Sequence, residues 1–156
     1  MTLCSEVISR LSGKTLVTAE SCTGGGIGYH LTAVSGSSAV YKGGVISYCN
    51  AVKHSVLGVD ADILDTIGPV SAPVAEAMAR GARRVLDADI AVSVTGLAGP
   101  GGDEYGNPQG RVHIGYSDEY ITLSREFTFS GDREAVRLAA VREALKLILE
   151  QNPIEN

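Results

Sequence analysis

The chain has few cysteines and histidines, and those present are not spaced as metal or redox sites require. The three cysteines, Cys4, Cys22 and Cys49, cannot all pair within one chain and form no Cys-x-x-Cys motif, so we expect reduced thiols. The three histidines show no His-x-x-x-His spacing. We therefore expect neither a disulfide framework nor a metal site.

Long apolar runs and an excess of basic residues are also missing. No run approaches the roughly 20 apolar residues that a membrane helix needs, and residues 1–6 lack the pattern of a signal peptide. The formal net charge of −5 argues against broad binding to nucleic acid or anionic lipid. We expect a cytoplasmic protein with no nucleic-acid or membrane partner, although one local basic position could still bind a small anion.

Helical and strand patterns alternate along the chain, whose 156 residues are typical of a single domain at 1–156. The order predicts an α/β fold with three α/β/α layers, in which a mixed, mostly parallel sheet ends in an antiparallel C-terminal hairpin. We expect Asn50 and Ser71 to cap helices. The predicted helices span about 3–11, 27–34, 50–53, 60–67, 71–86 and 132–149, and the predicted strands about 15–19, 45–49, 89–95, 110–116 and 121–129.

A hydroxyl, thiol and glycine cluster lies at 18–26, between the first predicted strand and the second predicted helix. Backbone N–H groups at such a junction have no partner within the helix and favour a phosphate or an oxyanion. Ser21 is the first candidate nucleophile, with an oxyanion hole formed by the N–H groups of Cys22 and Thr23. Two alternatives stay open: Ser21 only caps the helix, or the Cys22 thiol is the nucleophile.

A serine nucleophile needs a base, and Lys53 is the only lysine in the segment that follows the second predicted strand. The amine must be neutral part of the time, which requires burial or a nearby cation. Tyr48, five positions earlier, could relay a proton between Lys53 and Ser21 or hold the lysine in place. Alternatively, Lys53 is a solvated helix residue and Tyr48 a buried strand residue.

A third polar junction follows the strand predicted at 89–95, where Thr95 and Gly96 open a long glycine-rich connection. Backbone N–H groups and a hydroxyl there suit a phosphate or ribose, while the spacing matches no nucleoside triphosphate or dinucleotide motif. Arg133, at the start of the last helix, could contact an anion or form an ordinary surface ion pair. Because ligands in open α/β sheets collect beyond the carboxyl ends of strands, we expect these junctions to form one pocket.

Four ordered motifs resemble the C-terminal domain family of the competence/damage-inducible protein CinA, over nearly the whole chain. They are Ala19-Glu20-Ser21-Cys22-Thr23-Gly24-Gly25, Gly43-Gly44-Val45-Ile46-Ser47-Tyr48 with Asn50 and Lys53, Gly68-Pro69-Val70-Ser71, and Thr95-Gly96-Leu97-Ala98-Gly99-Pro100. The chain departs from the family pattern at 107–112, and it resembles the stand-alone form of the family rather than its larger two-domain members.

The resemblance implies a nicotinamide-nucleotide amidase, which hydrolyses the carboxamide of nicotinamide mononucleotide to nicotinate mononucleotide and ammonia without metal or organic cofactor. It implies Ser21 as nucleophile with Tyr48 and Lys53 as partners, the same three-layer fold, and association into homo-oligomers. We expect Cys22, Thr23, Gly24, Thr95, Gly96 and Arg133 to contact the substrate. The alternatives are a catalytically silent mononucleotide-binding or regulatory module, and a serine-lysine hydrolase that acts on another amide.

Overall fold

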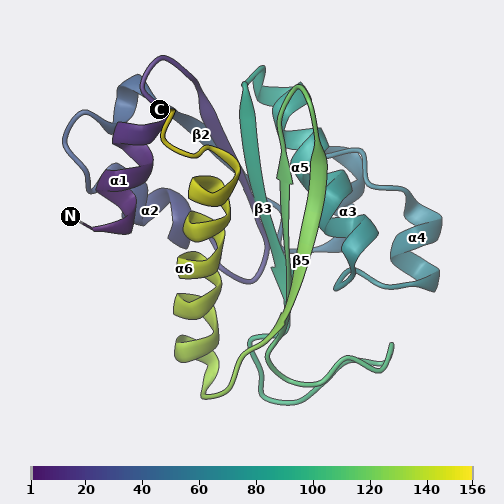
Figure 1. Cartoon of the computed structure of the whole chain (residues 1–156). Helices are drawn as coiled ribbons and strands as arrows, with labels where there is room; N and C mark the ends of the chain where they lie inside the picture. The colour runs from purple at the N-terminus through teal and green to yellow at the C-terminus, as the bar shows by residue number, and fades with distance from the viewer. Residues whose placement is uncertain (1, 156) are drawn as a thin grey trace.

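The computed structural model describes residues 2–155 as a five-stranded sheet between two layers of helices (Figure 1). One layer holds α1, α2 and α6, and the other holds α3, α4 and α5. The helices are α1 Leu3–Arg10, α2 Gly26–Thr32, α3 Asn50–Ser55, α4 Ala61–Thr66, α5 Ala72–Leu86 and α6 Arg133–Gln151, with a short 3₁₀ helix η1 at Ser37–Ala39. The strands are β1 Leu16–Glu20, β2 Tyr41–Ile46, β3 Ile90–Gly96, β4 Arg111–Ser117 and β5 Thr122–Thr128.

The sheet has the strand order β2-β1-β3-β4-β5. β1 pairs in parallel with both β2 and β3, whereas β4 pairs antiparallel with both β3 and β5. Four strands thus point the same way, although only half of the neighbouring pairs are parallel. The predicted mixed α/β sheet with a C-terminal hairpin is confirmed, and the carboxyl ends of β1, β2 and β3 meet at one edge.

Alternation along the central strands creates one apolar core on each face of the sheet. In β1, Leu16 packs into the core under α1, α2 and α6, whereas Val17 and Ala19 pack into the core under α5. In β3, Val92 faces the first core and Ala91 the second. This period of two is what a strand covered on both faces requires, so β1 is rigidly held where it ends at the candidate site.

The second strand was predicted at the wrong position. The expected strand at 45–49 is β2 at Tyr41–Ile46, on the edge of the sheet. The sequence does not reveal this strand because Gly44 interrupts the apolar pattern. A Cβ on Gly44 would clash with Thr18 Oγ1, so the close pairing with β1 requires glycine. As a result, Ser47 and Tyr48 lie beyond the strand.

Two of the predicted helix caps also differ. Cys49, not Asn50, occupies the N-cap position of α3, and Asn50 is the first helical residue. Ser71 does occupy the N-cap position of α5, but its hydroxyl donates to the Gly68 carbonyl and makes no cap hydrogen bond.

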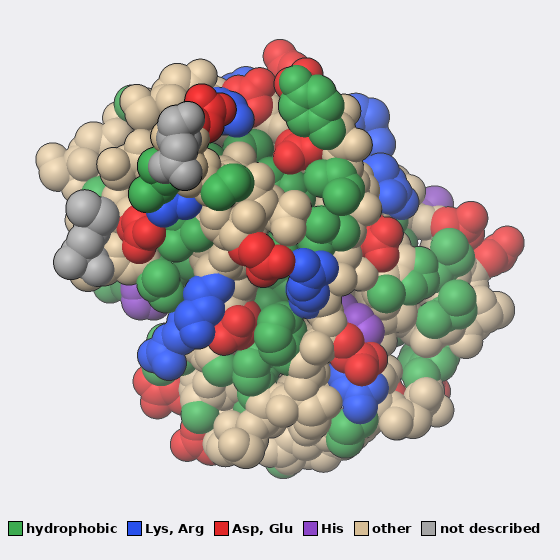
Figure 2. All heavy atoms as spheres, in the orientation of Figure 1, with side chains coloured by type: hydrophobic (Ala, Val, Ile, Leu, Met, Phe, Trp, Pro, Cys, Tyr) green, Lys and Arg blue, Asp and Glu red, His purple; other side chains and the backbone are tan. Residues whose placement is uncertain are grey.

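Acidic and basic side chains are interspersed over the face shown in Figure 2, which presents no broad basic area. This distribution fits the net charge of −5. Within residues 2–155, no helix is long and apolar enough to cross a membrane.

Candidate active site

Ser21 and Lys53 meet at the carboxyl edge of the sheet. Ser21 directly follows β1, and its N–H extends the β-ladder by donating to the Val94 carbonyl at 3.0 Å. Lys53, on α3, is 2% exposed, and its Nζ lies 2.9 Å from Ser21 Oγ. The predicted contact between the candidate nucleophile and the candidate base is therefore present without any intermediate group. Lys53 is not the solvated helix residue that we kept as an alternative.

The surroundings of Lys53 favour the neutral amine that a base must be. Burial lowers the pKa of Lys53 from 10.5, while the neighbouring Cys49 and Cys22 oppose the shift. Its hydrogen-bond partners are both neutral, namely Ser21 Oγ and the Ser47 carbonyl at 2.8 Å. No carboxylate within residues 2–155 forms an ion pair with it. A buried amine without a counter-ion releases its proton more readily than one in water.

Tyr48 does not hold the lysine as expected. The chain leaves β2 after Ile46, so Ser47 points inward and is fully buried, whereas Tyr48 points outward and is 62% exposed. The Ser47 carbonyl, and not the Tyr48 hydroxyl, accepts a hydrogen bond from Lys53 Nζ and so holds the lysine in place. Tyr48 Oη instead accepts a hydrogen bond from Arg133 Nη2 at 3.0 Å, and no hydrogen bond joins it to Ser21 or Lys53.

Arg133 links Tyr48 to the glycine-rich connection between β3 and β4. Its Nη1 donates to the Gly99 carbonyl at 2.6 Å, and its Nη2 to Tyr48 Oη. Both acceptors are neutral, and no ion pair involves Arg133 within residues 2–155, so the alternative of an ordinary surface ion pair is not seen there. The positive charge of Arg133 remains available to an anion.

The turn after Ser21 provides two free N–H groups. Gly24 N donates to the Ser21 carbonyl and Gly26 N to the Thr23 carbonyl, whereas the N–H groups of Cys22 and Thr23 meet no acceptor from another described residue. Gly24 adopts a φ of +59°, which glycine accommodates most readily. These two N–H groups are therefore the candidate donors of the expected oxyanion hole.

The N-terminus of α2 is not open to a substrate phosphate, contrary to our expectation. The side chain of Glu20, 2% exposed, already occupies it. Glu20 Oε1 accepts from Ile27 N at 2.8 Å and Oε2 from Gly28 N at 3.1 Å. Thr23 Oγ1 and Thr18 Oγ1 donate to the same carboxylate. The chain's own anion therefore satisfies the helix, and it ties the Ser21 turn to α2.

Sequence reasoning gave Glu20 no function, although its place in the first motif was visible. A carboxylate six residues before a helix, Glu20 to Gly26, is outside the usual capping positions. Only the tight glycine turn brings it back onto the first helical N–H groups. The signal that could have found it is a charged residue at the end of an otherwise apolar strand, which must find partners when buried.

We expect Glu20→Gln to reduce the free energy of unfolding by about 2 kcal/mol or more. The amide keeps the shape of the carboxylate but removes the charge, and it turns an NH₂ group toward hydrogen-bond donors. Urea denaturation measures the loss. Glu134→Gln, an exposed change in the first turn of α6, is the matched control and should shift stability by less than about 0.5 kcal/mol. Equal stability of wild type and Glu20→Gln would contradict this interpretation of the buried carboxylate.

Thr95 and Gly96 lie at the same edge of the sheet, but both make contacts within the protein. Thr95 is 1% exposed and its hydroxyl donates to the Pro69 carbonyl at 2.7 Å, so only its acceptor capacity is left. A Cβ on Gly96 would lie 2.6 Å from Val112 Cγ2, so packing against β4 requires glycine there. Both residues border the edge where Ser21 lies, yet neither offers the free donor that a phosphate needs.

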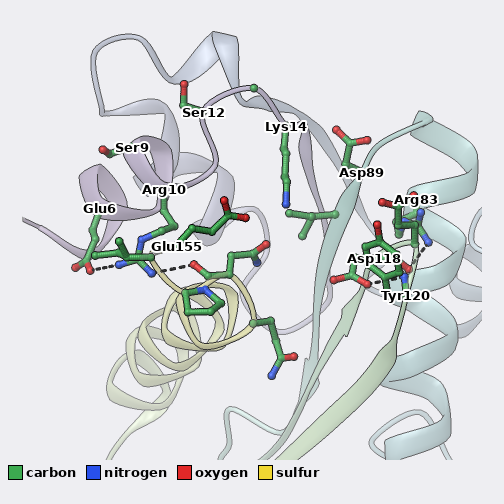
Figure 3. A pocket seen from close by; sticks show the side chains of 17 residues that line it. Glu6, Ser9, Arg10, Ser12, Lys14, Arg83, Asp89, Asp118, Tyr120 and Glu155 are labelled. Atoms are coloured by element: carbon green, nitrogen blue, oxygen red, sulfur yellow. Dashed lines mark hydrogen bonds and ion pairs between the residues drawn. The ribbon is translucent and has the colours of Figure 1, made fainter.

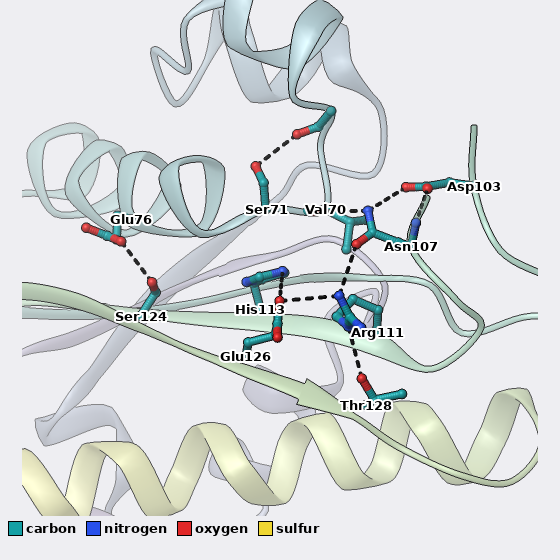
Figure 4. A network of polar contacts seen from close by, with 11 residues as sticks. Val70, Ser71, Glu76, Asp103, Asn107, Arg111, His113, Ser124, Glu126 and Thr128 are labelled. Carbon is teal, nitrogen blue, oxygen red and sulfur yellow. Dashed lines mark hydrogen bonds and ion pairs between the residues drawn. The ribbon is translucent and has the colours of Figure 1, made fainter. Parts of the chain in front are cut away.

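The long connection that follows is ordered by its own polar contacts (Figure 4). Asn107 Nδ2 donates to Asp103 Oδ2 at 2.9 Å and to the Val70 carbonyl at 3.1 Å. Arg111 reaches Glu126 at 3.3 Å, and His113 lies 3.5 Å from the same carboxylate. This network anchors the end of the connection to the segment before α5 and to β5.

Cys22 is poorly suited to be the nucleophile. Its side chain is 5% exposed, and burial raises the pKa of the Cys22 thiol to about 11 despite the nearby cations Arg137 and Lys53. The thiol is therefore protonated near neutral pH, and the thiolate is the reactive form. Cys22 packs in the core under α2 and α6, as the packing alternative predicted.

Two grooves open on the surface formed by the described residues. One, of about 630 Å³, borders the candidate site and is lined by the glycine turn, β2, α2 and α6. The other, of about 1120 Å³, lies at the opposite edge of the sheet (Figure 3). There Arg10 pairs with Glu6 at 2.9 Å and Arg83 donates to the Asp118 carbonyl at 2.7 Å. Its charged side chains largely bond within the protein, and Ser21 and Lys53 are remote from it.

Known proteins share the sequence and the fold. The family model for the CinA C-terminal domain matches residues 2–152. A CinA-like protein of Synechococcus sp. (strain RCC307) is 47% identical over 150 residues, which cover 94% of this chain and 36% of that protein. A CinA-like protein of Geobacter sulfurreducens is 44% identical over 136 residues, 87% of this chain and 33% of that protein. The chain thus spans about a third of the length of these relatives.

Solved structures agree over almost the whole chain. The competence/damage inducible protein CihA of Agrobacterium tumefaciens has a TM-score of 0.93 and 40% identity, covering 97% of this chain and 94% of that one. The competence damage-inducible protein A of Klebsiella pneumoniae has a TM-score of 0.93 and 38% identity, covering 96% and 94%. Together with the matching sheet, helices and motifs, these findings show that the chain belongs to the CinA C-terminal domain family.

Proposed function

We propose that this chain is a nicotinamide-nucleotide amidase that converts nicotinamide mononucleotide and water to nicotinate mononucleotide and ammonia. The observation that carries the proposal is the buried contact of 2.9 Å between Ser21 Oγ and an amine without a carboxylate partner. A serine beside a base of lowered pKa is the arrangement that attacks amides and esters. The choice of substrate within that class comes from the family resemblance.

The charges around the site fit an anionic substrate. Lys53 and Arg137 contact the Ser21 turn, Arg133 contacts Tyr48 and Gly99, and the hydrogen bonds of the three side chains all go to neutral oxygens. Within residues 2–155, none of the three forms an ion pair, in a chain of net charge −5. Of the three, Lys53 is the neutral base of the proposal and Arg137 is bound to the turn, so Arg133 is the cation that attracts a phosphate-bearing molecule. We assign its anionic end to Arg133 and Tyr48, which border the exposed side of the site.

In the proposed reaction, Lys53 takes the proton of Ser21 as the hydroxyl oxygen attacks the amide carbon. The N–H groups of Cys22 and Thr23 stabilise the resulting oxyanion. Lys53 then passes the proton to the amide nitrogen, the C–N bond breaks, and ammonia leaves an ester on Ser21. Water attacks this ester as Lys53 takes its proton, the bond between Ser21 Oγ and the acyl carbon breaks, Lys53 returns the proton to Ser21, and the carboxylate product departs. Contacts to the phosphate end hold the amide in line with Ser21.

The test is ammonia release from nicotinamide mononucleotide by the purified protein, measured against buffer. Stoichiometric ammonia and nicotinate mononucleotide support the proposal. Binding without turnover would instead establish a silent mononucleotide-binding or regulatory module. Equal turnover of simple amides that lack a phosphate would establish a serine-lysine hydrolase of another specificity. Homo-oligomerisation stays a prediction, which the mass of the protein in solution tests.

A further inference from the structure

Arg137 contacts the Ser21 turn in a way that sequence reasoning did not anticipate. It lies on α6, more than a hundred residues from the turn. Its Nε donates to the Cys22 carbonyl at 3.0 Å, and its Nη2 donates to the Thr23 carbonyl at 3.2 Å. The planar guanidinium thus donates hydrogen bonds to two successive carbonyl groups of the segment that carries Ser21. A lysine, with one nitrogen, cannot match this pair of contacts.

The direction of these contacts matters because a peptide group is planar and trans. The carbonyl of Cys22 and the N–H of Thr23 belong to one peptide group and point in opposite directions. When Arg137 holds the Cys22 carbonyl, it also fixes the Thr23 N–H to point away from α6. α3, which carries Lys53, lies on the other side of the sheet from α6 (Figure 1).

The neighbouring N–H is fixed without Arg137. The N–H of Cys22 shares a peptide group with the Ser21 carbonyl, which accepts a hydrogen bond from Gly24 N at 3.1 Å. The backbone of the turn therefore orients the Cys22 N–H by itself. The orientation of the Thr23 N–H depends on Arg137, which lies on the distant helix α6. A cation bound to the carbonyl also polarises that peptide group, which strengthens its N–H as a donor.

We propose that Arg137 is a positioning residue that aims the Thr23 N–H at the developing oxyanion on the substrate, an inference that rests on the proposed amidase function. Arg137 donates to no side chain and forms no ion pair within residues 2–155. Its two hydrogen bonds both go to the nucleophile's turn, and its side chain lines the open groove beside Gly24 and Gly25. The role predicts effects on the chemical step, not on substrate affinity.

The experiment compares Arg137→Ala and Arg137→Lys with wild type. We expect Arg137→Ala to lower kcat about 100-fold with KM changed less than about threefold, because an oxyanion donor is lost only in the transition state. Arg137→Lys keeps the charge but not the paired contacts, and we expect it to lose about tenfold. Arg142→Ala, an exposed arginine on the same helix, is the matched control and should leave kcat and KM unchanged.

A second measurement does not depend on the substrate. The rate at which a fluorophosphonate labels Ser21 depends on the nucleophile and the oxyanion donors, so we expect it to fall with kcat in Arg137→Ala. Guanidinium chloride at low concentration should restore part of both rates, because the vacated position opens onto the groove, whereas equal sodium chloride should not. Rescue of this kind shows that the protein is folded and lacks only the cation.

The outcomes separate this inference from the proposed function. Raised KM with unchanged kcat would make Arg137 a substrate-binding residue and overturn the positioning role. Unchanged labelling and unchanged kcat in both variants would overturn it as well. If wild type is labelled at Ser21 but releases no ammonia from nicotinamide mononucleotide, the proposed substrate fails, and the labelling rates of the Arg137 variants still decide the positioning role.

Discussion

Ser21→Ala is expected to abolish ammonia release, lowering kcat by about 10⁴-fold or more, as loss of a nucleophile does in serine hydrolases. The variant removes one oxygen from a side chain that is 7% exposed, and the turn keeps its backbone hydrogen bonds to Val94 and Gly24. The fold and the affinity for the mononucleotide should therefore survive. Release of ammonia measures the first effect, and calorimetric titration of the substrate onto the inactive variant measures the second.

Cys22→Ala is the control that distinguishes the two candidate nucleophiles of the turn. The thiol is buried and its pKa is raised to about 11, so we expect its loss to leave kcat within about tenfold of wild type. The small cavity left under α2 should cost about 1 kcal/mol of stability. An inactive Cys22→Ala that is folded, together with an active Ser21→Ala, would refute the serine assignment.

The fold was predictable because its strongest signals are local. The buried strand β3 and the long helices α5 and α6 carry apolar periods that fix their type. The edge strand β2 was misplaced because its alternating side chains are half-buried and two of its residues are glycines. The position of β2 is determined by its pairing with β1, which no local sequence pattern indicates.

The contact between Ser21 and Lys53 was predictable from the sequence, whereas the groups that hold the two residues in place were not. Ser21 and Lys53 follow adjacent parallel strands, so topology alone brings them to one edge. The side chain and carbonyl groups that hold them come from three other sources: the Ser47 carbonyl, the Glu20 carboxylate and the Arg137 guanidinium. Backbone carbonyls carry no sequence signature, and contacts between residues more than a hundred positions apart cannot be inferred from one chain.

The same limit explains why the position of Tyr48 was predicted wrongly. Its spacing to Lys53 suggested that both side chains share one space, but an early end of β2 turns Tyr48 toward solvent and Arg133. The direct contact between Ser21 and Lys53 makes a proton relay through Tyr48 unnecessary. Tyr48 therefore fits better with the substrate's anionic end than with the proton transfer.

Lys53→Met is expected to lower kcat by about 10³-fold or more, because methionine fills the same buried space but cannot accept the Ser21 proton. In wild type the reaction requires neutral Lys53, so the rate should rise with pH as the amine loses its proton. Since burial lowers the pKa of Lys53, the midpoint of this rise should lie below 10.5. A pH–rate profile checks it, and the residual rate of Lys53→Met should lack this inflection.

The same titration should be visible in stability. Between the lowered pKa in the folded protein and 10.5 in the unfolded chain, the unfolded state binds more protons, so the free energy of unfolding attributable to Lys53 rises with pH in that window. Below the window, protonation of the buried amine lowers stability relative to Lys53→Met. Urea denaturation of both proteins across this range isolates the contribution of Lys53 from other groups that titrate. A difference between the two proteins that does not change with pH would mean that Lys53 keeps its ordinary pKa, and it could then not serve as the base.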